Sequence, residues 1–376
     1  MREKFYPFML EREMSIWENQ VEYNLSESGV HPMTTLELFD GDELLIEEFL
    51  ATELNYPQTN GLIELREQIA RLYPEVKADQ VVVTSGAAQA NFTTLLTTMD
   101  PGDEIVVMLP NYMQIWGAAK NYHLKVKTFS LKEEDDWQLD VDELKRTVSE
   151  KTRLIAICNP NNPTGHILSA EEREAIVQAA DRMGAWILAD EVYAGAEHNS
   201  DEITPSLWGD YERVFAIGSL SKAYALPGLR IGWVVAPGNL ADDIWARQDY
   251  VTISATMLGN KLAAYALSPE VMPRIIDRTR NYVRRGYDNF ARWCEQRSDL
   301  FSHVPPQAAA IAFVRYNRDV NSSDLVKRLI NEQSTLVVPG DHFGLDQHLR
   351  ISYGLAEDYV NEGLERIYQT LISAPS

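Results

Sequence analysis

The stretch Ser219-Leu-Ser-Lys222-Ala-Tyr-Ala-Leu-Pro-Gly228-Leu-Arg230-Ile-Gly-Trp233 decides the fold and marks a candidate site. Lys222 follows an apolar run at residues 214–217 and stands in a serine-rich turn, where its amine can point inward. Ser219 and Arg230 flank it with a hydroxyl and a guanidinium, two groups suited to binding a phosphate. A lone lysine in a loop is usually a surface residue, but this spacing of three matched groups favours a nucleophilic lysine.

Two further segments place polar groups after apolar runs that are typical of buried strands. Asp190 and Tyr193 follow residues 186–189; the carboxylate can pair with a ring nitrogen, and the tyrosine can hydrogen-bond a phenolic oxygen. Asn162 follows residues 154–157 in a loop with two prolines and a glycine, and it can donate to the same oxygen. Sites in α/β proteins form at such strand ends, although an isolated aspartate there is more often a helix cap.

Three weaker signals fit the same site. Gly86-Ala87-Ala88 follows residues 81–83 and opens a helical stretch, whose first N–H groups can bind a phosphate. Tyr112, after residues 105–108, can stack on a ring, although a buried tyrosine without function is equally common. Arg350 stands in an apolar run, and its bidentate fork suits a carboxylate.

Together these groups describe a site for pyridoxal 5'-phosphate (PLP), with Lys222 as the Schiff-base lysine and Arg350 for the carboxylate of an amino-acid substrate. The apolar runs at 81–83, 105–108, 154–157, 186–189, 214–217 and 232–235 predict an α/β fold with a mainly parallel sheet buried on both faces. Ser169 and Glu172 form a capping box that begins one covering helix, and Gly184 ends it.

The rest of the chain predicts a second, smaller α+β unit. Residues 257–297 have a long helical pattern, followed by an extended stretch at 308–314 and helices at 323–332 and 357–372. We expect an N-terminal segment at 1–50 that covers the site and joins the small domain, a large PLP-binding domain at 51–280 and a small C-terminal domain at 281–376.

Charge and composition exclude several classes of function. The 376 residues include 34 Lys and Arg against 56 Asp and Glu, and the net charge of −22 argues against nucleic acid as a partner. No apolar run reaches the ~20 residues of a membrane helix, and no secretory signal is present. Two unpaired cysteines and scattered histidines predict a cytoplasmic protein without a metal site. Most of the acidic excess is explained by solubility, but some carboxylates can line a site for a cationic substrate.

From Tyr56 to Gly354 the chain resembles the fold-type I PLP-dependent aminotransferase superfamily, class I/II. Lys222 and Arg230 have the family's eight-residue spacing, and Ser219 stands three before the lysine. The resemblance implies a homodimer with shared sites, in which Tyr56 reaches the partner's phosphate. The other implied cofactor contacts are Gly86, Ala87, Ala88, Tyr112, Asn162, Asp190, Tyr193, Ser219, Lys222 and Arg230.

The acidic N-terminal segment, with Trp17-Glu18 and the stretch from Ser26 to Pro32, resembles oxygen- and PLP-dependent arginine oxidases and hydroxylases. That resemblance implies that Glu18, with Ser15 and Glu27, binds a guanidinium, and that His31 lies over the substrate in proton transfer. A solvated acidic helix and a turn histidine are the simpler interpretations of the same residues.

The first hypothesis is therefore an arginine oxidase, in which O2 removes electrons from a quinonoid intermediate and a 2-keto product and ammonia are released. A conventional aminotransferase with a keto-acid co-substrate is the second, and a cyclisation enzyme of the capreomycidine synthase kind is the third. A PLP-sensing transcription regulator would need a basic DNA-binding domain before residue 56, and the acidic segment there argues against one.

Overall fold

The computed structural model describes residues 5–373, and its largest element is an eight-stranded sheet. Strands β8, β7, β6, β3 and β4 are parallel neighbours, whereas β9 and β5 run antiparallel to the strands beside them. The predicted α/β fold with a mainly parallel sheet is confirmed. The strand order is β2 (Val81–Thr84), β9 (Gly232–Val235), β8 (Val214–Ser219), β7 (Trp186–Asp190), β6 (Thr152–Cys158), β3 (Glu104–Leu109), β4 (Lys125–Lys132) and β5 (Gln138–Leu139).

All six predicted strands belong to this sheet, but β4 and β5 were not predicted. β4 lies near the edge of the sheet and alternates Lys and Thr with apolar residues, so only Phe129 and Leu131 are buried. That half-buried pattern differs from the continuous apolar runs of the central strands.

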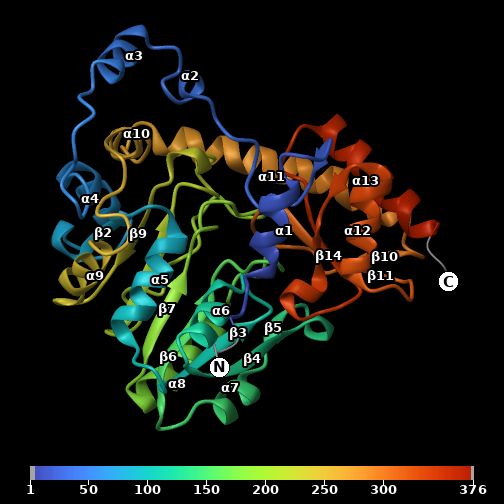
Figure 1. Cartoon of the computed structure of the whole chain (residues 1–376), viewed down its shortest axis with the longest axis horizontal. Coiled ribbons are helices and arrows are strands. Elements are labelled where there is room, and N and C mark those ends of the chain that lie inside the picture. The colour runs from blue at the N-terminus through green and yellow to red at the C-terminus, as the bar shows by residue number, and fades with distance from the viewer. Residues whose placement is uncertain (1–4, 374–376) are drawn as a thin grey trace.

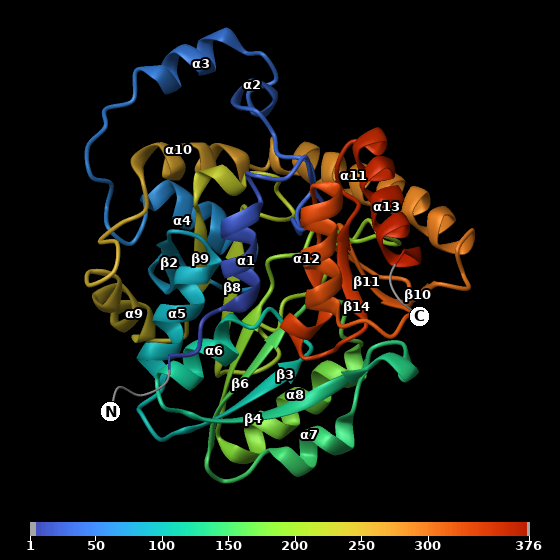
Figure 2. The same cartoon turned by 45° about the vertical axis from the view of Figure 1, so that its right-hand side comes forward.

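Helices cover both faces of the sheet, as Figures 1 and 2 show. The capping box predicted for α8 is present: Ser169 and Glu172 exchange hydrogen bonds, and Gly184 ends the helix at a φ of 62°. Its buried stripe includes Ile176 and Ala180, whereas Met183 is only partly buried. These helices are α5 (Ala87–Thr98), α6 (Gln114–Asn121), α7 (Val141–Thr147), α8 (Ala170–Met183) and α9 (Leu240–Gln248). Short 3₁₀ turns occur at Ala78–Gln80, Glu133–Asp135, Pro227–Leu229 and Gly340–Phe343.

The C-terminal part forms a second sheet of order β10-β11-β14-β13, entirely antiparallel. The strands are β10 (Phe301–His303), β11 (Ile311–Tyr316), β13 (Val338–Pro339) and β14 (His348–Ser352), with helices α12 (Ser322–Gln333) and α13 (Glu357–Ile372). The helical region expected at 257–297 is two helices, α10 (Met257–Ala266) and α11 (Met272–Glu295), because a proline-containing break separates them.

The N-terminal segment joins this second unit and also reaches the large sheet. β1 (Tyr23–Asn24) pairs in parallel with β12 (Thr335–Leu336). Both views place α1 (Met9–Trp17) between the helices of the large sheet and α12, whereas α2 (Thr35–Leu38) and α3 (Glu43–Leu50) project before the chain returns at α4 (Ile63–Ala70). Within residues 5–373, no helix is long and apolar enough to cross a membrane.

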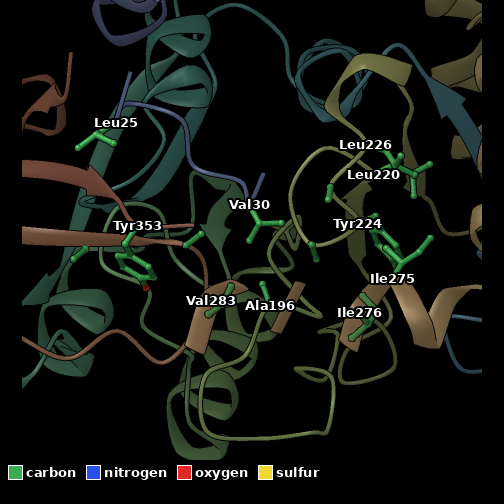
Figure 3. Close-up of a cluster of buried hydrophobic side chains, with 14 of the residues drawn as sticks. Leu25, Val30, Ala196, Leu220, Tyr224, Leu226, Ile275, Ile276, Val283 and Tyr353 are labelled. Atoms are coloured by element: carbon green, nitrogen blue, oxygen red, sulfur yellow. The ribbon is translucent and has the colours of Figure 1, made fainter. Parts of the chain in front are cut away.

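Two buried side chains fix the turn that follows β1. Leu25 and Val30 belong to one apolar cluster with Val283 and Tyr353, and Figure 3 shows these four side chains within that cluster. Residues 26–29 are therefore held between two buried anchors. A Cβ built on Gly29 would lie 3.3 Å from the carbonyl oxygen of Ser221, so this turn packs against the lysine-bearing loop.

Candidate active site

A cavity of about 320 Å³ lies where the carboxyl ends of the parallel strands meet α1. The predicted site residues that line it are Glu18, Glu27, Ala87, Ala88, Tyr112, Asn162, Asp190, Tyr193, Ser219, Lys222, Arg230 and Arg350. A larger hollow of about 1000 Å³ touches the same wall at Val192 and Ser219, but Lys222 does not line it. The smaller cavity is therefore the candidate site.

Lys222 is half-buried in the wall of this cavity, one turn after β8 ends at Ser219. Among the described residues, its amine has no hydrogen-bond or ion-pair partner. Burial lowers the pKa of the amine; the charge of Arg350 lowers it further, and that of Glu27 opposes the shift. An amine with a lowered pKa is more often deprotonated near neutral pH, which is the form that attacks a carbonyl.

Asp190 ends β7 as a buried carboxylate. It accepts hydrogen bonds from Asn91 Nδ2 at 2.8 Å and from the Val192 N–H at 3.3 Å. Burial raises the pKa of Asp190, while these donors favour the ionised form. Nearby, the Tyr193 hydroxyl donates to Ser28 Oγ at 2.8 Å, which links β7 to the N-terminal segment.

Arg230 and the start of α5 form a cationic corner of the cavity. Gly86 precedes α5 with a φ of 83°, and a Cβ added there would lie 2.3 Å from Arg230 Nη2, so only glycine leaves room for the guanidinium. The Ser219 hydroxyl donates to Ser221 Oγ at 2.9 Å beside this corner. Free N–H groups at a helix N-terminus, hydroxyls and a guanidinium make a phosphate site. Gly86 thus leaves room for the Arg230 guanidinium, although it does not itself line the cavity.

Arg350 projects from β14 as a fully buried side chain. Its Nη1 donates to Asn162 Oδ1 at 3.0 Å, its Nη2 donates to the Ser26 carbonyl, and the guanidinium lies 5.6 Å from the ring centroid of Phe343. Its Nε is buried without a hydrogen-bond partner, and burial lowers the pKa of the guanidinium. A carboxylate bound in the cavity would satisfy this donor.

Part of the cavity wall is acidic. Glu11 and Glu18 belong to α1 and its C-terminal cap, and Glu27 belongs to the turn after β1. Burial raises the pKa of Glu18, and the charges of Glu27 and Glu11 raise it further. Mutual repulsion of this kind is relieved when a cation binds between carboxylates.

Besides Gly86, three predicted site residues lie outside the cavity in this structure, and the expectation that His31 and Ser15 face the substrate requires correction. His31 is exposed and stacks on Tyr282 with ring centroids 6.2 Å apart, whereas the preceding Val30 is buried and the chain bends at His31. Ser15 is exposed beside the α1 face that carries Glu11 and Glu18. Tyr56 is 81% exposed.

The structure adds lining residues that the sequence analysis did not assign. Asn91 follows Ala87 by four residues, so helical spacing alone could have placed it on the cavity face. Cys158 was noted only as an unpaired cysteine, yet it ends β6 in the cavity wall, where burial raises the pKa of its thiol. Glu11 was one of several acidic residues without a role. Leu10, Met14, Ser28, Val192, Ser221 and Pro227 complete the lining.

These groups fit PLP, which combines an aldehyde, a ring nitrogen and a phosphate. Lys222 offers an unpaired amine, Asp190 a fixed carboxylate for the ring nitrogen, and Arg230 a cation beside the α5 N-terminus. The unpaired Arg350 Nε serves the substrate rather than the cofactor. The fold and this site define a PLP-dependent enzyme of fold type I.

The chain belongs to the aminotransferase class I and II family, whose model matches residues 48–367. It is 29% identical to a capreomycidine synthase from Streptomyces vinaceus over 94% of this chain and 90% of that protein. It is 28% identical to an aspartate aminotransferase from Streptomyces avermitilis over 85% of this chain and 82% of that one. A PLP-dependent aminotransferase from Streptococcus suis has the same fold, with a TM-score of 0.92, 30% identity and 99% of each chain covered. Members of this family are PLP-dependent enzymes that act on amino acids.

Proposed function

We propose that this chain is a PLP-dependent oxidase of L-arginine that uses O2. The observation that carries the choice of substrate is the acidic wall formed by Glu11, Glu18 and Glu27, in the same cavity as the unpaired Arg350 Nε. An α-carboxylate at Arg350 and a guanidinium at the acidic wall would satisfy both sets of charges at once. The choice of O2 rests on the resemblance of the N-terminal segment to arginine oxidases.

In this proposal, PLP supplies a carbonyl for covalent attachment and a ring that withdraws electrons. Asp190, held by Asn91 and the Val192 N–H, would pair with the ring nitrogen. Lys222 Nζ would hold the cofactor and, as an amine of lowered pKa, would take the proton from the substrate Cα. The two residues would thus act differently, because the carboxylate would hold the ring while the amine would exchange protons.

The remaining residues bind and enclose the substrate. Arg350 fixes the α-carboxylate, and Glu18 and Glu27 bind the guanidinium by charge-assisted hydrogen bonds. Leu10 and Met14 of α1 are buried beside the cavity and exclude water from that side. In its simplest balanced form, arginine, O2 and water give the 2-keto acid, ammonia and hydrogen peroxide; two electrons pass from the Cα–N bond to O2.

Two alternatives are supported by the relatives. The aspartate aminotransferase and the Streptococcus suis enzyme favour transamination, in which a 2-keto acid rather than O2 regenerates the cofactor. The capreomycidine synthase favours a cyclisation reaction. His31 lies outside the cavity, so its position does not distinguish the oxidase from the two alternatives. Acidic side chains that bind a cationic substrate are compatible with all three reactions.

Oxygen uptake by the PLP-loaded enzyme with L-arginine as sole substrate separates these functions. We expect sustained consumption over many turnovers and a 2-keto product. Turnover only after 2-oxoglutarate or pyruvate is added would establish an aminotransferase, and a cyclic product without oxygen uptake would establish a cyclase. Either result would refute the oxidase.

Glu18→Gln is expected to lower kcat/KM for L-arginine more than for L-citrulline, whose side chain has nearly the same shape but no charge. Loss of one charge-assisted contact corresponds to a fall of about 10- to 100-fold in kcat/KM for arginine. The measurement is the ratio of kcat/KM for the two amino acids in wild type and variant. Equal losses for both substrates would contradict a guanidinium site at Glu18.

We also propose that Tyr56 completes the site of a second subunit. Its side chain is exposed, as are Leu44, Leu50 and Leu54 on and after the projecting α3, so this arm offers an apolar face to another copy. We expect dimers that combine Tyr56→Ala and Lys222→Ala subunits to recover one high-affinity site per dimer, because one site then has both wild-type groups. Mixed dimers no better than the Tyr56→Ala homodimer would place Tyr56 outside the partner's site.

A further inference from the structure

The segment before α1 and the first turn of α1 are fastened to the large sheet's helical layer by contacts at one corner of the cavity. Asn121, the last residue of α6, bonds both the N–H and the carbonyl of Tyr6, at 2.8 and 2.9 Å. Phe8 packs edge-on against Tyr112 with ring centroids 5.0 Å apart. The Tyr112 hydroxyl donates to Glu11 Oε1 at 2.6 Å. The ring expected to stack on PLP therefore also holds α1.

Glu11 has a different electrostatic setting from Glu18, although both line the cavity. Glu11 lies in the first turn of the nine-residue α1, where the helix dipole favours a negative charge, whereas Glu18 is the C-terminal cap, where it does not. Burial and the neighbouring Glu11 raise the pKa of Tyr112 well above its ordinary value, so the phenol keeps the proton that it donates. Glu11 thus brings a negative charge that one hydrogen bond fixes in place.

The charge of Glu11 acts on two other groups that line the cavity. It contributes to the raised pKa of Glu18, and it opposes the lowering of the Lys222 pKa. A carboxylate that acts on both groups, and that is hydrogen-bonded to Tyr112, is more than a third member of an acidic wall.

We propose that Glu11 determines specificity for the cationic end of the substrate and that Tyr112 holds it in position, so that docking of α1 depends on the aromatic ring predicted to stack on PLP. This inference rests on the proposed cationic amino-acid substrate and deepens it. Glu11 completes the acidic wall only when its hydrogen bond to Tyr112 holds α1 against the cavity.

Two substitutions separate the charge from the attachment. Glu11→Gln removes the charge but keeps an oxygen that can accept from Tyr112, whereas Tyr112→Phe keeps the ring and the carboxylate but removes the hydroxyl. Two measurements on the holoenzyme follow: the Kd of L-arginine and L-citrulline without O2, and the rate of hydrogen exchange in residues 5–14.

For Glu11→Gln, we expect arginine affinity to fall about 10- to 100-fold with citrulline affinity and exchange unchanged. For Tyr112→Phe, we expect faster exchange and a fall in arginine affinity of about fivefold or more, because the net loss of one hydrogen bond frees the helix. Asn121→Ala is the matched control, since it loosens the segment at Tyr6 without touching a cavity carboxylate.

These measurements distinguish an error in the proposed substrate from an error in the roles proposed for Glu11 and Tyr112. If the wild type binds arginine and citrulline equally well, the cationic substrate is wrong. If the wild type prefers arginine and Glu11→Gln keeps that preference, the inference about Glu11 is overturned while the substrate stands. If Tyr112→Phe exchanges in residues 5–14 like the wild type, the positioning role of Tyr112 is overturned.

Discussion

Replacing Lys222 by alanine is expected to abolish turnover and the visible absorbance of the Schiff base with the cofactor. The amine is the only described lysine nitrogen that lines the cavity, so no neighbouring lysine can take its place in covalent attachment. The loss of proton transfer alone corresponds to about 10²- to 10⁴-fold in rate, and the loss of covalent attachment adds to it. PLP is still expected to bind without a covalent bond, because Arg230, α5 and Asp190 remain.

Absorption spectra and cofactor content after dialysis, measured together, test this expectation. Lys222→Arg is the matched control, because it preserves the positive charge near Glu27 but forms no Schiff base. Both variants should melt at a temperature close to that of the wild type, since Lys222 makes no hydrogen bond in the described part of the chain. A visible, covalently held cofactor in either variant would show that another amine carries it.

That most of the predicted site residues line one cavity has a physical reason. Lys222, Asp190 and Asn162 each follow a continuous apolar run, and such runs form parallel strands whose carboxyl ends meet at one edge. Placing the strands therefore places the polar residues that follow them. The fold class and the common position of these residues in the cavity wall were predictable because local pattern and tertiary position coincide there.

In the N-terminal segment, the local sequence pattern does not determine the tertiary position of the side chains. His31 is exposed whereas Val30 is buried in the apolar cluster that includes Leu25 and Val283, and the chain bends at Gly29 and at His31. Nothing in the local sequence identifies which neighbour is buried. Similarly, the rotation of α1 is set by its docking through Tyr112, and this brings Glu11 to the cavity and leaves Ser15 exposed.

Loss of Arg350 is the second large effect expected, and it differs in kind from loss of the acidic wall. In Arg350→Leu the α-carboxylate of every amino-acid substrate enters a buried site without its counter-charge. Removing one partner of a buried charge pair costs about 2–5 kcal/mol, so kcat/KM should fall by about 30- to 5000-fold. The fall should be similar for arginine and citrulline, because both carry the same α-carboxylate.

Agmatine, which is arginine without the α-carboxylate, isolates this contribution. Wild type should bind arginine more tightly than agmatine, and Arg350→Leu should bind the two nearly equally, as measured by their Kd values without O2. Glu18→Gln should do the reverse: it keeps the preference for arginine over agmatine and reduces the preference for arginine over citrulline. Arg350→Lys, which keeps a charge but loses the bidentate fork, should fall between wild type and Arg350→Leu. An Arg350→Leu enzyme that still distinguishes arginine from agmatine would place the α-carboxylate elsewhere, and the two ends of the cavity would then have to be reassigned together.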